Sequence, residues 1–132
     1  MAIRVLLTDD EDEVRHLVHA ALGLDDRFEV VGEATSGAQA VELVRERHPD
    51  VVLLDLRMPA MNGLEAAAIF HRESPSTGIV VYSAFLTDEA KETARSMGAT
   101  ACLDKLTPIR QLVEALVEAA HLPTSGTGPS ST

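Results

Sequence analysis

Short apolar runs alternate with amphipathic stretches along this chain. The apolar runs cover residues 3–8, 28–34, 51–54, 79–83 and 100–103. The runs at 3–8, 51–54 and 79–83 are rich in Val, Ile and Leu, which is typical of strands that are buried on both faces, and 28–34 and 100–103 are expected to be short strands. Between them, apolar residues recur every three or four positions over 13–23, 36–47, 64–72, 87–97 and 107–121, which predicts amphipathic helices. Five strands and five helices are therefore expected to alternate.

Residues that favour helix ends or loops mark several of the predicted boundaries. A capping box pairs a polar N-cap residue with Glu or Gln three positions later, and Pro is favoured in the first helical turn. Pro59 should make residues 57–60 a stiff loop, because it lacks an amide donor and restricts the residue before it. The proposed start signals are Asn62 with Glu65, Ser36 with Gln39, Thr87, and Pro108 at the first helical position of the last helix.

This alternation predicts an α/β fold with a mainly parallel sheet flanked by helices, because strands that alternate with helices pair through right-handed crossovers. The length of 132 residues corresponds to one domain. We assign residues 1–122 to this domain. The segment 123–132 is rich in Pro, Thr, Ser and Gly and is expected to be a disordered tail or the start of a linker.

Composition narrows the classes of partner. The formal net charge is −10, which opposes binding to nucleic acid phosphates and to anionic membranes. No apolar run approaches the roughly 20 residues of a membrane span. Cys102 is the only cysteine, so an internal disulfide is excluded and a reducing compartment is favoured. We therefore expect a cytoplasmic protein without direct contacts to membranes or nucleic acid.

Polar side chains follow four of the five predicted strands. The carboxyl ends of parallel strands meet at one edge of a sheet, where ligands bind in open α/β folds. The first and third strands end in carboxylates, the fourth ends in a hydroxyl, and a lysine follows the fifth. These candidate site residues are Asp9, Asp10, Asp55, Ser83 and Lys105.

The candidate residues favour chemistry on a phosphoryl group. Three converging carboxylates repel one another unless a cation lies between them, and Mg²⁺ prefers oxygen ligands together with water or phosphate oxygens. Lys105 and Ser83 are suited to binding phosphate oxygens. A carboxylate such as Asp55 can itself be the nucleophile that accepts a phosphoryl group.

Four motifs in this order resemble the receiver domain of two-component response regulators. They are the acidic pair at 9–10, L-L-D-L-R-M-P-x-M-N-G at 53–63, Y-S-A at 82–84 and G-A-x-x-x-L-x-K at 98–105. The resemblance covers residues 3 to about 121. It implies a flavodoxin-like, doubly wound sheet of five strands in the order 2-1-3-4-5, with five flanking helices.

The resemblance also implies a role for each candidate residue. Asp55 would accept a phosphoryl group from a histidine kinase in phosphorelay signalling. Mg²⁺ would be bound by Asp10, Asp55 and the backbone carbonyl of Arg57, with Asp9 acting through water. Ser83 and Lys105 would bind the phosphoryl oxygens, and Ser83 would move toward them on activation. Such a domain catalyses only its own phosphorylation and dephosphorylation.

Two positions depart from the family pattern. Cys102 stands where the family usually has Tyr or Phe, whose ring reports activation, and Leu106 follows the lysine where many members have Pro. We expect a trans bond before Leu106, because a cis bond there would cost about 3 kcal/mol. The segment F-E-V-V-G-E-A at 28–34 is similar to the corresponding segment of receivers that precede a helix-turn-helix DNA-binding domain in transcription regulators.

Several alternatives stay open. The chain is either a receiver-only regulator or part of a longer protein with a C-terminal DNA-binding domain, and we favour the second. It could pair with a second copy on phosphorylation, through the fifth strand and its flanking helices. Competing functions are a degenerate interaction domain that is not phosphorylated and a phosphatase with an aspartyl nucleophile, although Arg57 stands where such phosphatases have a second Asp. His16 and His19 lie one helical turn apart and form a weaker candidate metal site.

Overall fold

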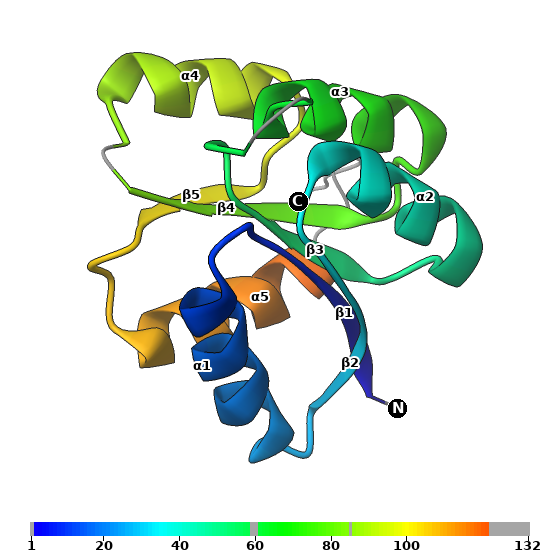
Figure 1. The fold of residues 1–132 in the computed structure, drawn as a ribbon, viewed down its shortest axis with the longest axis vertical. Coiled ribbons are helices and arrows are strands. Elements are labelled where there is room, and N and C mark those ends of the chain that lie inside the picture. Colours follow the sequence, from blue (N-terminus) through cyan, green and yellow to red (C-terminus); the bar gives the residue numbers. More distant parts are fainter. Residues whose placement is uncertain (1, 59–60, 85, 122–132) are drawn as a thin grey trace.

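Five parallel strands form one sheet in the order β2-β1-β3-β4-β5 (Figure 1). The computed structural model describes residues 2–58, 61–84 and 86–121. The strands are β1 (Ile3–Thr8), β2 (Phe28–Ala34), β3 (Val51–Leu54), β4 (Gly78–Ser83) and β5 (Ala101–Asp104). The helices between them are α1 (Asp12–Gly23), α2 (Gly37–Arg47), α3 (Gly63–Glu73), α4 (Asp88–Ser96) and α5 (Ile109–His121). The predicted α/β class, strand order and helix number are confirmed.

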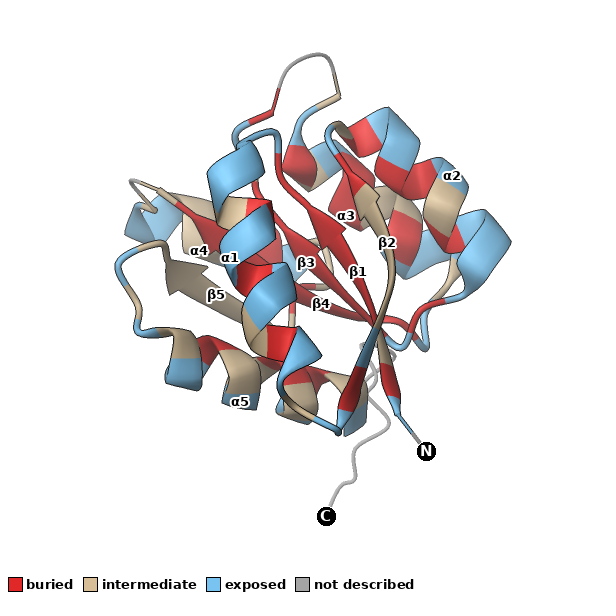
Figure 2. Cartoon of the chain, turned by 60° about the horizontal axis from the view of Figure 1, so that its bottom comes forward, coloured by how far each residue is buried: buried red, intermediate tan, exposed pale blue. Residues whose placement is uncertain are grey.

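The helices lie in two layers, with α1 and α5 on one face of the sheet and α2, α3 and α4 on the other (Figure 1). Each layer buries its own apolar cluster, because successive side chains of a strand point to opposite faces. Leu6 and Leu54 pack toward α2 and α3, whereas Leu7 and Leu53 pack toward α1 and α5. The central strands β1, β3 and β4 are almost entirely buried, and β5 is half-buried throughout (Figure 2).

Most predicted boundaries lie within a residue or two of the observed ones. β5 begins and ends one residue later than predicted, and Pro108 directly precedes α5 instead of occupying its first position. Asn62 and Glu65 form the full capping box. The second predicted box is half formed, because Ser36 accepts the Gln39 amide while the Gln39 side chain accepts the Thr35 amide.

Two further expectations can be compared with the structure. The peptide bonds among the described residues are all trans, including the one before Leu106. None of the helices in the described ranges is long and apolar enough to cross a membrane. The predicted stiff loop at Pro59 and the predicted disordered tail at 123–132 involve residues outside those ranges.

Candidate functional site

The strand ends bring four of the predicted site residues together. β1 and β3 pair in register from Val5 with Val51 to Thr8 with Leu54, so Asp9 and Asp55 leave neighbouring strands at the same level. β4 and β5 likewise end together, with Ser83 opposite Asp104. Lys105 follows at the tip of β5. The parallel register therefore converts four distant sequence positions into one cluster at the carboxyl edge of the sheet.

Asp55 lies at the centre of this cluster and is 3% exposed. Its Oδ1 accepts hydrogen bonds from Ser83 Oγ at 2.7 Å and from the Arg57 amide at 3.0 Å. Its Oδ2 accepts a hydrogen bond from Lys105 Nζ at 3.0 Å. α3 begins directly against this strand end, because a Cβ on Gly63 would lie 2.4 Å from the Asp55 carbonyl oxygen. The carboxylate is therefore buried, ionically paired and held in one orientation.

One ammonium group serves three carboxylates. Lys105 Nζ lies 2.5 Å from Glu11 Oε1, 2.9 Å from Asp9 Oδ2 and 3.0 Å from Asp55 Oδ2. Burial alone would lower the pKa of Lys105, but hydrogen bonds to these carboxylates outweigh it and raise this pKa. Burial raises the pKa of Asp9 to about 6, and the nearby Asp55 charge adds to this effect, although the Lys105 and Glu11 hydrogen bonds oppose it. The three carboxylates therefore carry more negative charge than the one ammonium group beside them can compensate.

A cavity of about 300 Å³ opens beside these groups. Its lining residues are Asp10, Glu11, Asp55, Arg57, Ala84 and Lys105. Asp10 is exposed, and within the described part of the chain its carboxylate has no hydrogen bond or ion pair. Oxygen atoms of Asp9, Glu11 and Asp55 lie within 4.8 Å of one another. A set of carboxylate oxygens beside an accessible cavity fits a hard divalent cation such as Mg²⁺.

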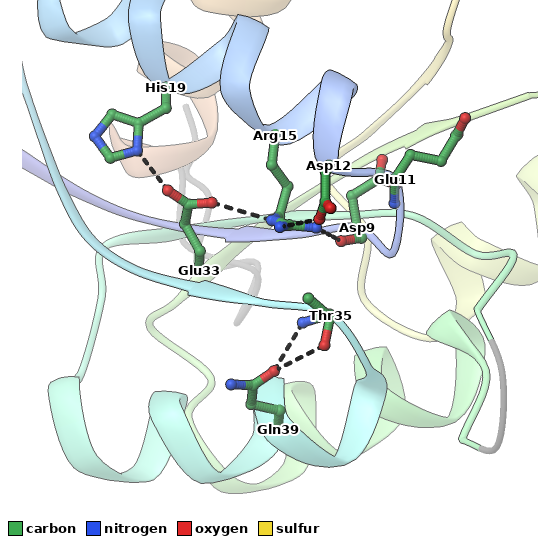
Figure 3. A network of polar contacts seen from close by, with 8 residues as sticks. All are labelled: Asp9, Glu11, Asp12, Arg15, His19, Glu33, Thr35 and Gln39. Carbon is green, nitrogen blue, oxygen red and sulfur yellow. Dashed lines mark hydrogen bonds and ion pairs between the residues drawn. The ribbon is translucent and has the colours of Figure 1, made fainter.

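The structure adds residues that the sequence did not reveal. Glu11, not Asp10, joins Asp9 and Asp55 in the carboxylate cluster, while Asp10 lines the cavity beside it. Because the whole run 9–13 is acidic, spacing could not show which of its carboxylates would converge. Arg15 was also missed. It is 8% exposed and contacts the acidic loop (Figure 3).

Two other sequence candidates lie apart from the cluster. Cys102 is half-buried on β5 and faces α4, where its Sγ lies 3.9 Å from the Lys91 carbonyl oxygen. Burial raises the pKa of the Cys102 thiol. The Nδ1 atom of His19 contacts Glu33 Oε2 at 2.6 Å (Figure 3). Neither His16 nor His19 belongs to the group of three ligating side chains found within the described ranges.

The arrangement at Asp55 suits attack on an electron-poor centre that carries negative charge. The carboxylate is a nucleophile, and the cavity admits a group the size of a phosphoryl ion with its cation. The Lys105 ammonium, the Ser83 hydroxyl and the Arg57 amide are donors already aimed at this point. Donors fixed where charge develops are the main source of electrostatic stabilisation in group transfer.

Comparison with known proteins agrees with this geometry. The family model described as "Response regulator receiver domain" matches residues 5–117. The nitrate/nitrite response regulator protein NarL of Escherichia coli is 40% identical over 116 residues, which is 88% of this chain and 54% of that protein. The transcriptional regulatory protein LiaR of Bacillus subtilis is 37% identical over 114 residues, which is 86% of this chain and 54% of LiaR.

A solved structure of a receiver domain has the same fold. The signal receiver domain of a NarL response regulator from Mycobacterium tuberculosis superposes with a TM-score of 0.87 at 36% identity, covering 91% of this chain and 97% of that domain. The chain spans about half the length of NarL and LiaR. It spans 25% of a similar protein-glutamate methylesterase from Photobacterium profundum, to which it is 37% identical over 101 residues. The similarity therefore concerns one domain of these longer proteins.

Proposed function

This chain belongs to the response regulator receiver domain family, and we propose that it is a Mg²⁺-dependent phosphoryl acceptor whose acceptor residue is Asp55. The donor is a histidine kinase, so the chain works in two-component signal transduction. The observation that carries this proposal is the environment of Asp55, a buried carboxylate with three donors directed at its oxygens beside an acidic cavity.

Mg²⁺ is the proposed cofactor because the carboxylates exceed the positive charge beside them. We assign its protein ligands to Asp10, Asp55 and the backbone carbonyl of Arg57, with Asp9 acting through water. Asp10 supports this assignment, since it lines the cavity and, within the described part of the chain, its carboxylate makes no hydrogen bond or ion pair. When bound, the cation would offset the negative charge of the donor phosphate and of the transition state.

The transfer step follows from the donors around Asp55. A carboxylate oxygen of Asp55 attacks phosphorus, the bond from phosphorus to the donor histidine nitrogen breaks, and its electron pair leaves with the imidazole. The Lys105 ammonium and the Ser83 hydroxyl then move from the carboxylate to the phosphoryl oxygens. Ser83 Oγ already lies 2.7 Å from Asp55 Oδ1, so only a short displacement is needed. The chain itself would catalyse only this transfer and the later hydrolysis.

The output of phosphorylation is proposed to be a change in a protein-interaction surface. Ser83 ends β4 and Lys105 follows β5, so their displacement affects β5 and its flanking helices α4 and α5. Cys102 has no aromatic ring that could rotate on activation. Its Sγ contacts the Lys91 carbonyl oxygen and so connects β5 to α4 on this face. Pairing of two copies through this surface would control a transcription regulator, with DNA bound by a C-terminal domain. The net charge of −10 opposes direct DNA contacts by this part.

The test is phosphorylation of the purified protein, which we expect to be cytoplasmic, with a small phosphoryl donor at neutral pH. Intact-mass analysis should show one added phosphoryl group in Mg²⁺ and none in chelator. Asp55→Asn should abolish the addition. Asp50→Asn is the matched control, because Asp50 precedes β3 at the opposite edge of the sheet. Full labelling of the Asp55 variant, or full labelling in chelator, would refute the assignment.

A further inference from the structure

Two basic side chains contact the acidic loop after β1 from different sides. Residues 9–13 are five consecutive acids, which repel one another at neutral pH. Lys105 pairs with the side chains of Asp9 and Glu11 from the β5 side. Arg15 approaches the same loop from α1, on the side facing β2 (Figure 3). Of these two basic residues, Lys105 contacts Asp55 and Arg15 does not.

Arg15 uses all three of its guanidinium nitrogens. Nη1 donates to the main-chain carbonyl of Asp9 at 2.7 Å, in a buried contact. Nη2 donates to Asp12 Oδ1 at 2.5 Å, and Nε donates to Glu33 Oε1 at 3.0 Å. A planar guanidinium with fixed donors can hold several oxygens in one geometry, which a flexible ammonium does not. The guanidinium therefore ties the backbone of Asp9 to two side chains at once.

Glu33 anchors this guanidinium to the sheet. It lies on β2, and its second oxygen contacts Nδ1 of His19 on α1 at 2.6 Å (Figure 3). Within the loop, Asp9 Oδ1 in turn accepts the Glu11 amide at 2.9 Å. A continuous chain of contacts thus runs from β2 through Arg15 to the main chain and side chain of Asp9.

We propose that Arg15, held by Glu33, is a positioning residue for the cation site. It fixes the carbonyl of Asp9 and draws the Asp12 carboxylate away from the cavity, so that Asp9 and Glu11 face Lys105 and Asp10 lines the cavity. This inference rests on the proposed function of the site as a Mg²⁺-dependent acceptor. Groups that orient metal ligands in this way typically change metal affinity by 10–100-fold when they are removed.

The test compares Mg²⁺ affinity in Arg15→Gln and Glu33→Gln with the wild type. Tyr82 is the single tyrosine, the chain has no tryptophan, and the Tyr82 hydroxyl donates to the Lys105 carbonyl at 3.3 Å. Tyrosine fluorescence therefore reports on this site during a Mg²⁺ titration. Both variants should bind Mg²⁺ about tenfold more weakly or worse. Amide exchange should accelerate over residues 10–12 in both.

The matched control is Arg45→Gln. Arg45 also makes a two-bond ion pair with a glutamate, Glu73, but this pair lies between α2 and α3. Its loss should leave Mg²⁺ affinity unchanged. If Arg15→Gln does not fold, Glu33→Gln and Arg15→Lys carry the test, since the latter keeps the charge and loses the fork of donors; both should still weaken Mg²⁺ binding.

The outcomes separate this inference from the proposed function. Folded variants whose melting temperature falls while Mg²⁺ affinity stays within twofold of wild type would overturn the positioning role of Arg15 and leave Asp55 phosphorylation intact. A wild type that neither binds Mg²⁺ nor accepts a phosphoryl group would overturn the proposed function itself. Weaker Mg²⁺ binding by both site variants, with Arg45→Gln unchanged, is the expected result.

Discussion

Replacing Asp9 by Asn should stabilise the metal-free protein. Asp9 is 3% exposed, and its carboxylate lies near the Asp55 charge. Burying a charged carboxylate near a second one costs stability. The single ammonium of Lys105 is shared among three carboxylates and compensates for only part of this cost. Asn keeps the shape of the side chain and removes the charge. Loss of this site carboxylate would then increase the free energy of unfolding.

The magnitude follows from the raised pKa of Asp9. Burial raises this pKa to about 6, whereas an aspartate in an unfolded chain has a pKa of about 3.9. The difference corresponds to about 3 kcal/mol of lost stability at neutral pH. This value is an upper limit for the variant, because a neutral Asn accepts a weaker hydrogen bond from Lys105 than a carboxylate does.

The pH dependence has a definite sign. At a pH below about 4, Asp9 is protonated in both the folded and the unfolded protein, so the wild type carries no penalty from it. Between about pH 4 and pH 6 the unfolded chain releases this proton more readily than the folded protein. The contribution of Asp9 to wild-type stability is therefore lost as the pH rises through about 6, and the advantage of Asp9→Asn should grow over the same range.

Urea unfolding followed by circular dichroism, in chelator and at constant ionic strength from pH 4 to pH 8, measures this difference. Asp26→Asn is the control, because it removes the same charge from an exposed loop position. Mg²⁺ should stabilise the wild type more than Asp9→Asn, since ligand binding to the folded state adds to its stability. An Asp9→Asn variant that is less stable than wild type at pH 7 in chelator, or an advantage independent of pH, would refute this reasoning.

Three further predictions concern packing, the switch region and a helix cap. Gly63→Ala should cost about 1–3 kcal/mol in urea unfolding, because its Cβ would meet the Asp55 carbonyl oxygen at 2.4 Å, whereas Gly23→Ala, with no atom within 4 Å, should cost nothing. Cys102→Tyr should still fold, at a cost of about 1–3 kcal/mol for the added ring, because this position is only half-buried; a loss of folding would contradict this. Thr87→Ala should destabilise α4 by about 1 kcal/mol, seen as faster amide exchange there, and Thr87→Ser should not.

The fold was predictable because local patterns and global architecture agree. Continuous apolar strands such as 51–54 can be satisfied only between two helical layers, and each helix has a recurrent apolar face. Errors arose at the sheet edge and at helix starts. β5 is half-buried, so its hydrophobic pattern did not fix its ends to the residue. Gln39 could bond either of two neighbouring amides, and spacing alone did not distinguish Thr35 from Ser36.

The site was predictable only at the level of strand ends. Asp55, Ser83 and Lys105 each lie at the carboxyl end of a strand, so topology alone brings them together. The acidic run was different, because five adjacent acids offer no periodic signal for which side chain turns inward. That choice depends on Arg15, which lies on the first turns of α1 and looks like an ordinary helix residue in the sequence.

The two basic side chains differ in a way that matches their proposed roles. Lys105 is a single ammonium that meets three carboxylates from a flexible stem, so it can exchange a carboxylate for a phosphoryl oxygen without losing its charge compensation. Arg15 is buried and contacts three oxygens through separate nitrogens, so any movement would break several hydrogen bonds together. The group that must move during transfer is thus the one with interchangeable partners, and the group that must keep the loop in place is the one with fixed partners.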